Sequence, residues 1–149
     1  MKAIIHETFG APKSVLRLDD IEMPEVGPDE ALIRIRATAV AKGDWLITRG
    51  LPYIARPSYG IRTPKHRVAG LEFAGTVEAV GSAVTRVAPG DDVVGWGFEA
   101  LAEYAAISQD QLVLKPSNVG FEQAAALPVS GFAALQAVRD QGGVGAGDR

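Results

Sequence analysis

The sequence predicts a mainly β fold, a small barrel of short strands followed by short helices toward the C-terminus. Three observations support this fold class. Short runs with alternating or β-rich composition recur at close spacing, separated by glycine and proline turns. The last thirty or so residues carry helix-type patterns instead. A chain of 149 residues that is 47% hydrophobic and 22% charged has the profile of one ordinary globular domain.

The clearest predicted strand is 30–40, where apolar residues alternate with residues that are mostly polar, so that one face suits a core. Gly70, Gly75 and Gly81 are expected to mark bends, bulges or close approaches of another backbone. The other expected strands are Lys2–His6, Val15–Leu18, Leu71–Gly81, Val93–Trp96, Glu103–Ile107 and Leu112–Leu114.

Short helices are expected where a capping residue precedes a helix-type run. Asp44 can cap a helical turn through 45–48, and residues 50–66, with three prolines and two glycines, are predicted to form a long loop. The two helices expected near the C-terminus are Phe121–Ala126, capped by Ser117 or Asn118, and Gly131–Asp140, capped by Ser130.

Composition excludes several function classes. Fifteen lysines and arginines against 18 acidic residues give a net charge of −3, which is too balanced for a whole-protein nucleic-acid or membrane binder. The sequence has no cysteine, so disulfides, cysteine-ligated zinc, iron–sulfur clusters and thiol nucleophiles are excluded. The longest uncharged apolar-rich run, 123–138, has 16 residues and is too short to span a membrane. We expect a cytoplasmic protein.

One stretch of the chain is strongly basic. No acidic residue occurs between Asp44 and Glu72, whereas five cationic residues and two tyrosines do. Three interpretations are open: a solvated surface loop, which charge runs usually form, a rim that attracts an anionic ligand, and a single-stranded nucleic-acid site using the tyrosines. The few aromatic residues and the acidic remainder of the chain disfavour the last.

Metal and phosphate sites find little support in the residue pattern. His6 and His66 each stand without a partner ligand three or four residues away. Glu72, among glycines and apolar residues, is expected to be exposed or buried and paired, for example with an arginine. The glycine-rich tail does not match a dinucleotide fingerprint, because Asp148 takes the place of the last glycine. The tail also follows a predicted helix, whereas the fingerprint needs a strand before it. The tail therefore indicates a connector.

Lys42 and Asp44 lie where the best predicted strand gives way to a helical turn. A lysine fixed at such an edge can polarise a carbonyl oxygen, and Asp44 can hold it or cap the helix. The residues alone leave a second interpretation open, in which Lys42 is a solvent-reaching lysine beside a helix cap.

Short motifs recur in a defined order over essentially the whole chain: Met1-Lys2-Ala3, Val40 to Trp45, Gly70-x-Glu72-x-Ala74-Gly75-x-Val77, Val80-Gly81, Gly90-Asp91-x-Val93, Glu103-Tyr104, Lys115-Pro116, Ala124 to Pro128 and Gly147-Asp148-Arg149. In order and spacing they resemble the medium-chain dehydrogenase/reductase family, specifically its zinc-free quinone-oxidoreductase-like branch. Zinc alcohol dehydrogenases of that family have a histidine and a cysteine where this chain has Leu71 and Ala41.

The resemblance implies a GroES-like, partly open β-barrel. Residues 1–128 would form the catalytic domain, and residues 129–149 a helix and connector toward a nucleotide-binding domain outside this sequence. The implied function is zinc-independent, NAD(P)H-dependent reduction of quinones, enones or related carbonyls by direct hydride transfer. NADP, or NAD, would bind only together with that other domain, so we expect the 149-residue chain alone to be inactive and not to bind the cofactor.

Within this resemblance, Lys42, Asp44 and Tyr53 are the candidate catalytic residues, with Tyr53 or solvent as the proton source. Lys42, Val129 and Ala133 are the candidate cofactor contacts, and no metal site is expected. The partner would be a small carbonyl or quinone substrate, with no nucleic acid or membrane involved and a homodimer left open for the full-length protein. The alternative function is a non-enzymatic GroES-like binding or assembly module.

Overall fold

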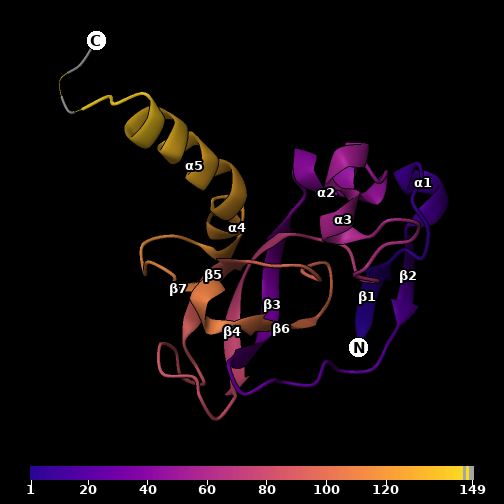
Figure 1. Ribbon diagram of the computed structural model, residues 1–149. Helices are drawn as coiled ribbons and strands as arrows, with labels where there is room; N and C mark the ends of the chain where they lie inside the picture. The colour runs from indigo at the N-terminus through magenta and orange to yellow at the C-terminus, as the bar shows by residue number, and fades with distance from the viewer. Residues whose placement is uncertain (146, 148–149) are drawn as a thin grey trace.

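The computed structural model describes residues 1–145 and 147, and in this part of the chain the fold is built on two antiparallel sheets (Figure 1). The smaller sheet pairs β1 (Lys2–Ile5) with β2 (Arg17–Asp20). The larger has the order β6-β3-β4-β5-β7. Its strands are β3 (Glu30–Ala39), β4 (Glu72–Val80), β5 (Asp92–Trp96), β6 (Tyr104–Ser108) and β7 (Leu112–Leu114). The sheets do not close on each other, which confirms the predicted partly open, GroES-like barrel.

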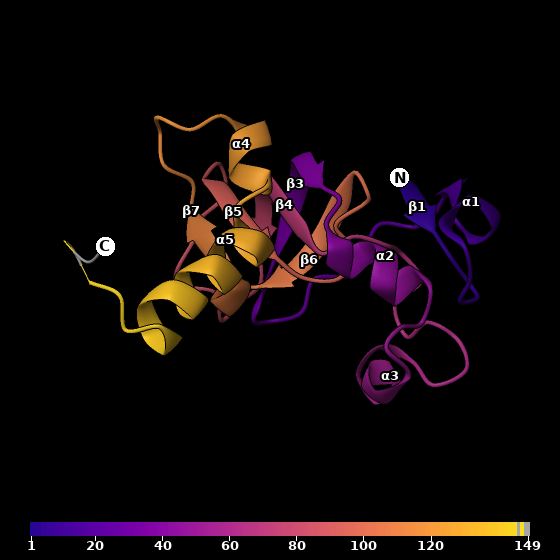
Figure 2. The same cartoon turned by 90° about the horizontal axis from the view of Figure 1, so that it is seen from above.

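Short helices occupy two opposite ends of the molecule. Figures 1 and 2 show α1, α2 and α3 gathered near the N-terminal sheet, while α5 projects away from the large sheet toward the C-terminus. The helical segments are α1 (Pro12–Val15), α2 (Lys42–Thr48), η1 (Tyr53–Ala55), α3 (Arg56–Tyr59), η2 (Gln109–Gln111), α4 (Phe121–Ala125), α5 (Pro128–Leu135) and the π-helical η3 (Gln136–Gln141). None of the described helices is long and apolar enough to cross a membrane.

Some element boundaries differ from the sequence-based prediction, and proline explains two of them. Val15 ends the helix α1 rather than beginning the predicted strand Val15–Leu18, and Pro12 suits the first position of that helix. Helix α5 likewise begins at Pro128, earlier than the predicted Gly131. The predicted loop 50–66 contains η1 and α3. The predicted connector 142–149 lies partly outside the described residues, which omit 146, 148 and 149.

The main core is formed by apolar side chains of the large sheet. In β3 the predicted alternation of buried and more exposed residues is confirmed. Ile33, Phe73 and Val93, from three neighbouring strands, are fully buried in one cluster, whereas Arg34 of β3 is exposed. Each such buried apolar side chain stabilises the fold by about 1.5–3 kcal/mol. Strand β3 also shifts register against β4 next to Gly75, where an added Cβ would lie 2.4 Å from the Arg34 carbonyl oxygen. The predicted close approach at this glycine is confirmed.

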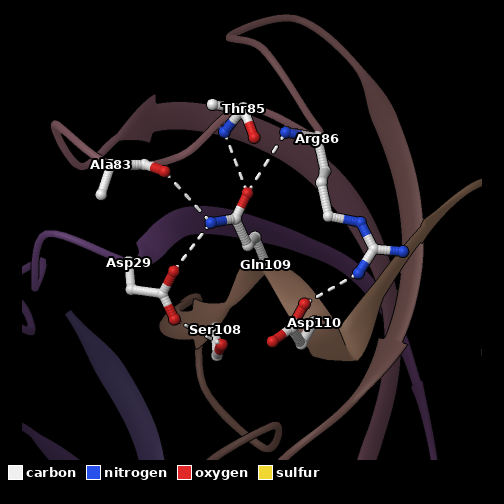
Figure 3. Close-up of polar contacts among 7 residues, drawn as sticks. All are labelled: Asp29, Ala83, Thr85, Arg86, Ser108, Gln109 and Asp110. Carbon is white, nitrogen blue, oxygen red and sulfur yellow. Dashed lines mark hydrogen bonds and ion pairs between the residues drawn. The ribbon is translucent and has the colours of Figure 1, made fainter.

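The buried Gln109 side chain joins three surface segments (Figure 3). Its Nε2 donates to Asp29 Oδ1 at 2.7 Å and to the Ala83 carbonyl at 3.2 Å. Its Oε1 accepts from the backbone N–H of Thr85 at 2.9 Å and of Arg86 at 3.2 Å. One amide thus satisfies polar groups of the turn before β3 and of the loop between β4 and β5.

Candidate active site

Helix α2 starts immediately after β3, and Asp44 fixes its first turn. The Asp44 Oδ2 atom accepts a hydrogen bond from the backbone N–H of Ala41 at 2.7 Å. Asp44 is the third residue of the helix, so it reaches back to the residue before the helix instead of capping from in front. The helix therefore begins at Lys42 rather than at the predicted Trp45.

Lys42 is exposed and lies over an aromatic ring. Its Nζ is 4.3 Å from the centroid of the Trp45 ring, and the Arg49 guanidinium is 4.6 Å from the same centroid. Trp45 therefore gives the lysine ammonium a defined resting position at the start of α2, through a cation–π contact. Lys42 and Asp44 both lie in the first turn of α2, at the end of β3 where the sequence places them.

Asp44 is an unusually buried carboxylate, only 7% exposed. Burial raises its pKa, although hydrogen bonds from the backbone N–H groups of Ala41 and of Asp44 itself oppose that rise. Its second oxygen, Oδ1, is buried without a hydrogen-bond partner among the described residues. A buried carboxylate oxygen normally accepts a hydrogen bond, and none of the described residues donates one to Oδ1.

A small cavity of about 20 Å³ lies beside α2, and Asp44, His6 and His66 all line it. His6 is 2% exposed, and burial lowers its pKa against the effect of a backbone hydrogen bond with His66. Its Nδ1 is also buried without a described partner. Sequence reasoning gave His6 no functional role, because the residues that surround it come from distant parts of the chain.

Tyr53 lies apart from this turn. It is the first residue of η1 and is 70% exposed, with the Arg56 guanidinium 4.7 Å from its ring centroid. Among the described residues, no hydrogen bond, ion pair or ring contact joins Tyr53 to Lys42 or Asp44. Its assignment as a catalytic residue stays a prediction.

The basic stretch is partly structural. Arg56 donates to the carbonyl oxygens of Gly50 at 3.0 Å and Ile61 at 3.1 Å, and so ties the loop together. Arg67 forms an ion pair with Glu7 at 3.1 Å. These contacts favour the interpretation of the stretch as a surface loop that uses some of its own cations.

Val129 and Ala133 lie one turn apart on α5 and line the same groove, of about 260 Å³, together with Trp96 and Phe132. The apolar lining suits a planar ring more than a charged group. The backbone N–H of Val129 donates to Glu72 Oε2 at 2.9 Å. Glu72, only 2% exposed, is therefore buried and paired as expected, with a helix N-terminus rather than an arginine as its partner.

Helices α2 and α5 are anchored at neighbouring positions of the large sheet. Glu72, which holds the start of α5, pairs in register with Ala39, the last residue of β3 before α2. Thr38 Oγ1 also donates to the Glu72 carbonyl oxygen at 2.7 Å. The Lys42 turn and the Val129 face thus start from the same end of the β3–β4 pair.

No group of three or more potential histidine, cysteine, aspartate or glutamate ligands occurs in the described part of the chain. The absence of zinc from the working protein stays a prediction, which metal analysis of the purified protein can check.

Comparison with known proteins identifies relatives of several kinds. A quinone-oxidoreductase homolog from the chloroplast of Spinacia oleracea is 34% identical over 142 residues, covering 93% of this chain and 42% of the relative. A chloroplastic NADPH-dependent alkenal/one oxidoreductase of Arabidopsis thaliana is 36% identical, covering 87% and 35%. The structure of the quinone oxidoreductase from Coxiella burnetii superposes with a TM-score of 0.83 at 35% identity, covering 99% of this chain and 47% of that one.

The chain spans less than half the length of these relatives. The family profile described as Alcohol dehydrogenase GroES-like domain matches residues 27–117, which is most of the chain. The relatives, the superposed structure and this profile together confirm the resemblance to the quinone-oxidoreductase-like branch of the medium-chain dehydrogenase/reductase family. This chain belongs to the alcohol dehydrogenase GroES-like domain family.

Proposed function

We propose that this chain is the catalytic-domain part of an NAD(P)H-dependent oxidoreductase that reduces quinones, enones or related carbonyl compounds by direct hydride transfer without zinc. The geometry that carries the proposal is the shared anchoring of α2 and α5, which starts the Lys42 turn and the apolar Val129 face from one end of the β3–β4 pair. The names of two relatives, a quinone oxidoreductase and an NADPH-dependent alkenal/one oxidoreductase, support the same reaction class.

Lys42 supplies positive charge at the substrate carbonyl. Its exposed ammonium rests over Trp45 and can swing from that ring to an oxygen that gains negative charge, because a lysine side chain has several rotatable bonds. Such charge stabilisation is often the largest single contribution to catalysis. Asp44 keeps the turn that carries Lys42 in place through its bond to the Ala41 N–H. Tyr53 or solvent delivers the proton that completes the reduction.

The apolar groove on α5 fits the nicotinamide end of a dinucleotide. Val129 and Ala133 present a flat apolar surface beside Trp96, which suits one face of a planar ring and keeps water from it. The cofactor, when bound, supplies the hydride. NADPH is favoured over NADH because a relative 36% identical to this chain is named as NADPH-dependent. Residues 129–149 lead on to the nucleotide-binding domain that completes the site, with residues 1–128 as the catalytic domain.

Replacement of Lys42 tests the proposal in the full-length protein. Lys42→Ala removes the ammonium, and we expect kcat/KM for a quinone or enone substrate to fall about 10²-fold, as when one stabilising donor of a developing charge is lost. NADPH oxidation followed by absorbance measures the effect. Lys13→Ala, at an exposed lysine on α1, is the matched control and should leave kcat/KM unchanged.

Two results would contradict the proposal. A Lys42→Ala enzyme with normal kcat/KM would remove the role of the lysine while leaving the reaction class intact. A full-length protein that oxidises neither NADPH nor NADH with any quinone, enone or aldehyde tested would favour the non-enzymatic binding module instead.

A further inference from the structure

The small cavity beside α2 is unusual because two buried polar atoms with no described partner both belong to residues that line it. Asp44 and His6 are 7% and 2% exposed, so neither side chain can turn to bulk solvent without opening the fold. The atoms concerned are Asp44 Oδ1 and His6 Nδ1. Buried polar groups in native proteins almost always have a hydrogen-bond partner.

The hydrogen positions can be assigned from the partners of the other atoms. The His6 ring makes a hydrogen bond to the backbone of His66. Since Nδ1 has no partner, that bond comes from Nε2–H, and a neutral ring then leaves Nδ1 as an acceptor. Asp44 Oδ1 is an acceptor as well, because an ionised carboxylate carries no proton. Two acceptors facing one cavity cannot bond each other, but a molecule with two O–H donors satisfies both.

We propose that one internal water molecule occupies this cavity and bridges His6 Nδ1 to Asp44 Oδ1, which makes His6 a positioning residue for Asp44. The cavity of about 20 Å³ exceeds the volume of about 10–15 Å³ that one water needs. Buried Thr48 also lines the cavity and offers a hydroxyl as a third polar group, within the two to four partners typical of a buried water.

The bridge fixes the orientation of the Asp44 carboxylate from both sides. Oδ2 holds the Ala41 N–H at 2.7 Å, and the water holds Oδ1 against the residue that follows β1. The first turn of α2 is therefore linked to the N-terminal sheet. The effect of this link on catalysis rests on the proposed function of Lys42, whereas the water bridge itself does not.

The bridge is tested directly by a high-resolution crystal structure of the full-length protein. We expect one water with both Asp44 Oδ1 and His6 Nδ1 at about 2.6–3.2 Å, the range of hydrogen bonds. In ¹⁵N NMR of histidine-labelled protein, the His6 signal should report the Nε2–H tautomer with Nδ1 as a hydrogen-bond acceptor. A direct contact between the two side chains, an empty cavity or an Nδ1–H tautomer would each overturn the proposal.

Two substitutions at His6 separate positioning from bulk packing. Asparagine places its amide near the position of Nδ1 and can keep the water, while leucine fills similar space without a polar atom. We expect His6→Leu to lower kcat/KM about tenfold, since displacement of a site by about 1 Å can cost up to 10²-fold, and His6→Asn to restore most of the loss. Equal activity of both variants and the wild type would contradict the catalytic link. If the crystallographic water were nevertheless present, the failure would belong to the role of Lys42 and not to the bridge.

Discussion

Burial shifts the pKa values of Asp44 and His6, two of the titratable groups that line the cavity beside α2, in opposite directions. It raises the pKa of Asp44 and lowers that of His6, because in both cases the charged form loses hydration. Each group therefore favours its neutral form more in the folded chain than in the unfolded one. The consequence for stability differs with pH, since aspartate and histidine titrate in different ranges.

The folded protein should lose stability on acidification below about pH 6.5, the ordinary pKa of histidine. In that range the unfolded chain protonates His6 more readily than the folded chain does, so protons favour unfolding. The loss has a slope of at most about 1.4 kcal/mol per pH unit for this one residue. Asp44 has the opposite effect, at lower pH. Because burial raises its pKa, protonation of Asp44 on acidification removes the free-energy cost of keeping a buried carboxylate ionised.

Urea unfolding of wild type and His6→Asn between pH 7.5 and pH 5 measures this dependence. The variant should show a flatter profile, because its side chain does not titrate. His66→Asn is the control, since the His66 side chain is 30% exposed and also lines the cavity. A His6→Asn profile as steep as that of wild type would show that His6 is not the residue responsible for the loss of stability at acidic pH.

Among the candidate site residues, the sequence identified those whose role depends on neighbours along the chain. Lys42 and Asp44 share a helical turn, so a local pattern was enough to select them. His6 could not be selected, because its cavity is built with residues about 40 and 60 positions away. Glu72 was expected to be paired, but a backbone amide as its partner leaves no trace in residue identity.

Among the elements, the 81–90 loop is bonded by the Gln109 side chain at three of its residues, Ala83, Thr85 and Arg86. Gln109 makes four hydrogen bonds, two of them to backbone N–H groups in that loop, while the Arg86 side chain adds an exposed ion pair to Asp110 at 2.8 Å. Bonds made by a buried amide contribute far more than an exposed ion pair, which is worth about 0–1 kcal/mol.

Gln109→Ala should therefore lower the free energy of unfolding by about 2–3 kcal/mol, since it leaves several polar groups without a partner. Arg86→Ala, the matched control, keeps its backbone bond to Gln109 and should cost less than about 1 kcal/mol. Urea denaturation followed by circular dichroism measures both. Equal losses for the two variants would show that the amide network is not what holds the loop.

The strands were predictable because apolar and polar residues alternate along short stretches of sequence, as the buried Ile33 and the exposed Arg34 show. Helix starts were less so. Pro128 begins α5 where the sequence alone suggested a break, since proline both ends one helix and suits the first position of the next. Element type was thus recovered more reliably than element boundaries.

In the molecule as a whole, the C-terminal helical segment carries exposed apolar side chains next to a groove. Phe132 and Leu135 of α5 are 61% and 47% exposed, Val138 of the following η3 is 54% exposed, and a groove of about 660 Å³ separates α5 from β5 and β7. A cluster of apolar side chains of this kind usually marks a surface that packs against something else.

The 149-residue chain should therefore self-associate through α5. The double substitution Phe132→Ser with Leu135→Ser should reduce the association seen by analytical ultracentrifugation and shift Tm by no more than about 2 °C, because exposed positions add little to stability. Leu18→Ser, at an exposed leucine of β2, is the control and should leave association unchanged. A large drop in Tm for the double variant would place α5 within the folding core.

The hydrogen bond between Glu72 and the Val129 backbone N–H attaches the first turn of α5 to β4. Helix α5 has no buried residue and extends away from the large sheet (Figure 1). The Glu72 carboxylate, in contrast, belongs to β4, which is paired with β3 on one side and β5 on the other. The hydrogen bond to Glu72 therefore joins the start of α5 to β4 directly opposite Ala39, the end of β3 from which the Lys42 turn starts.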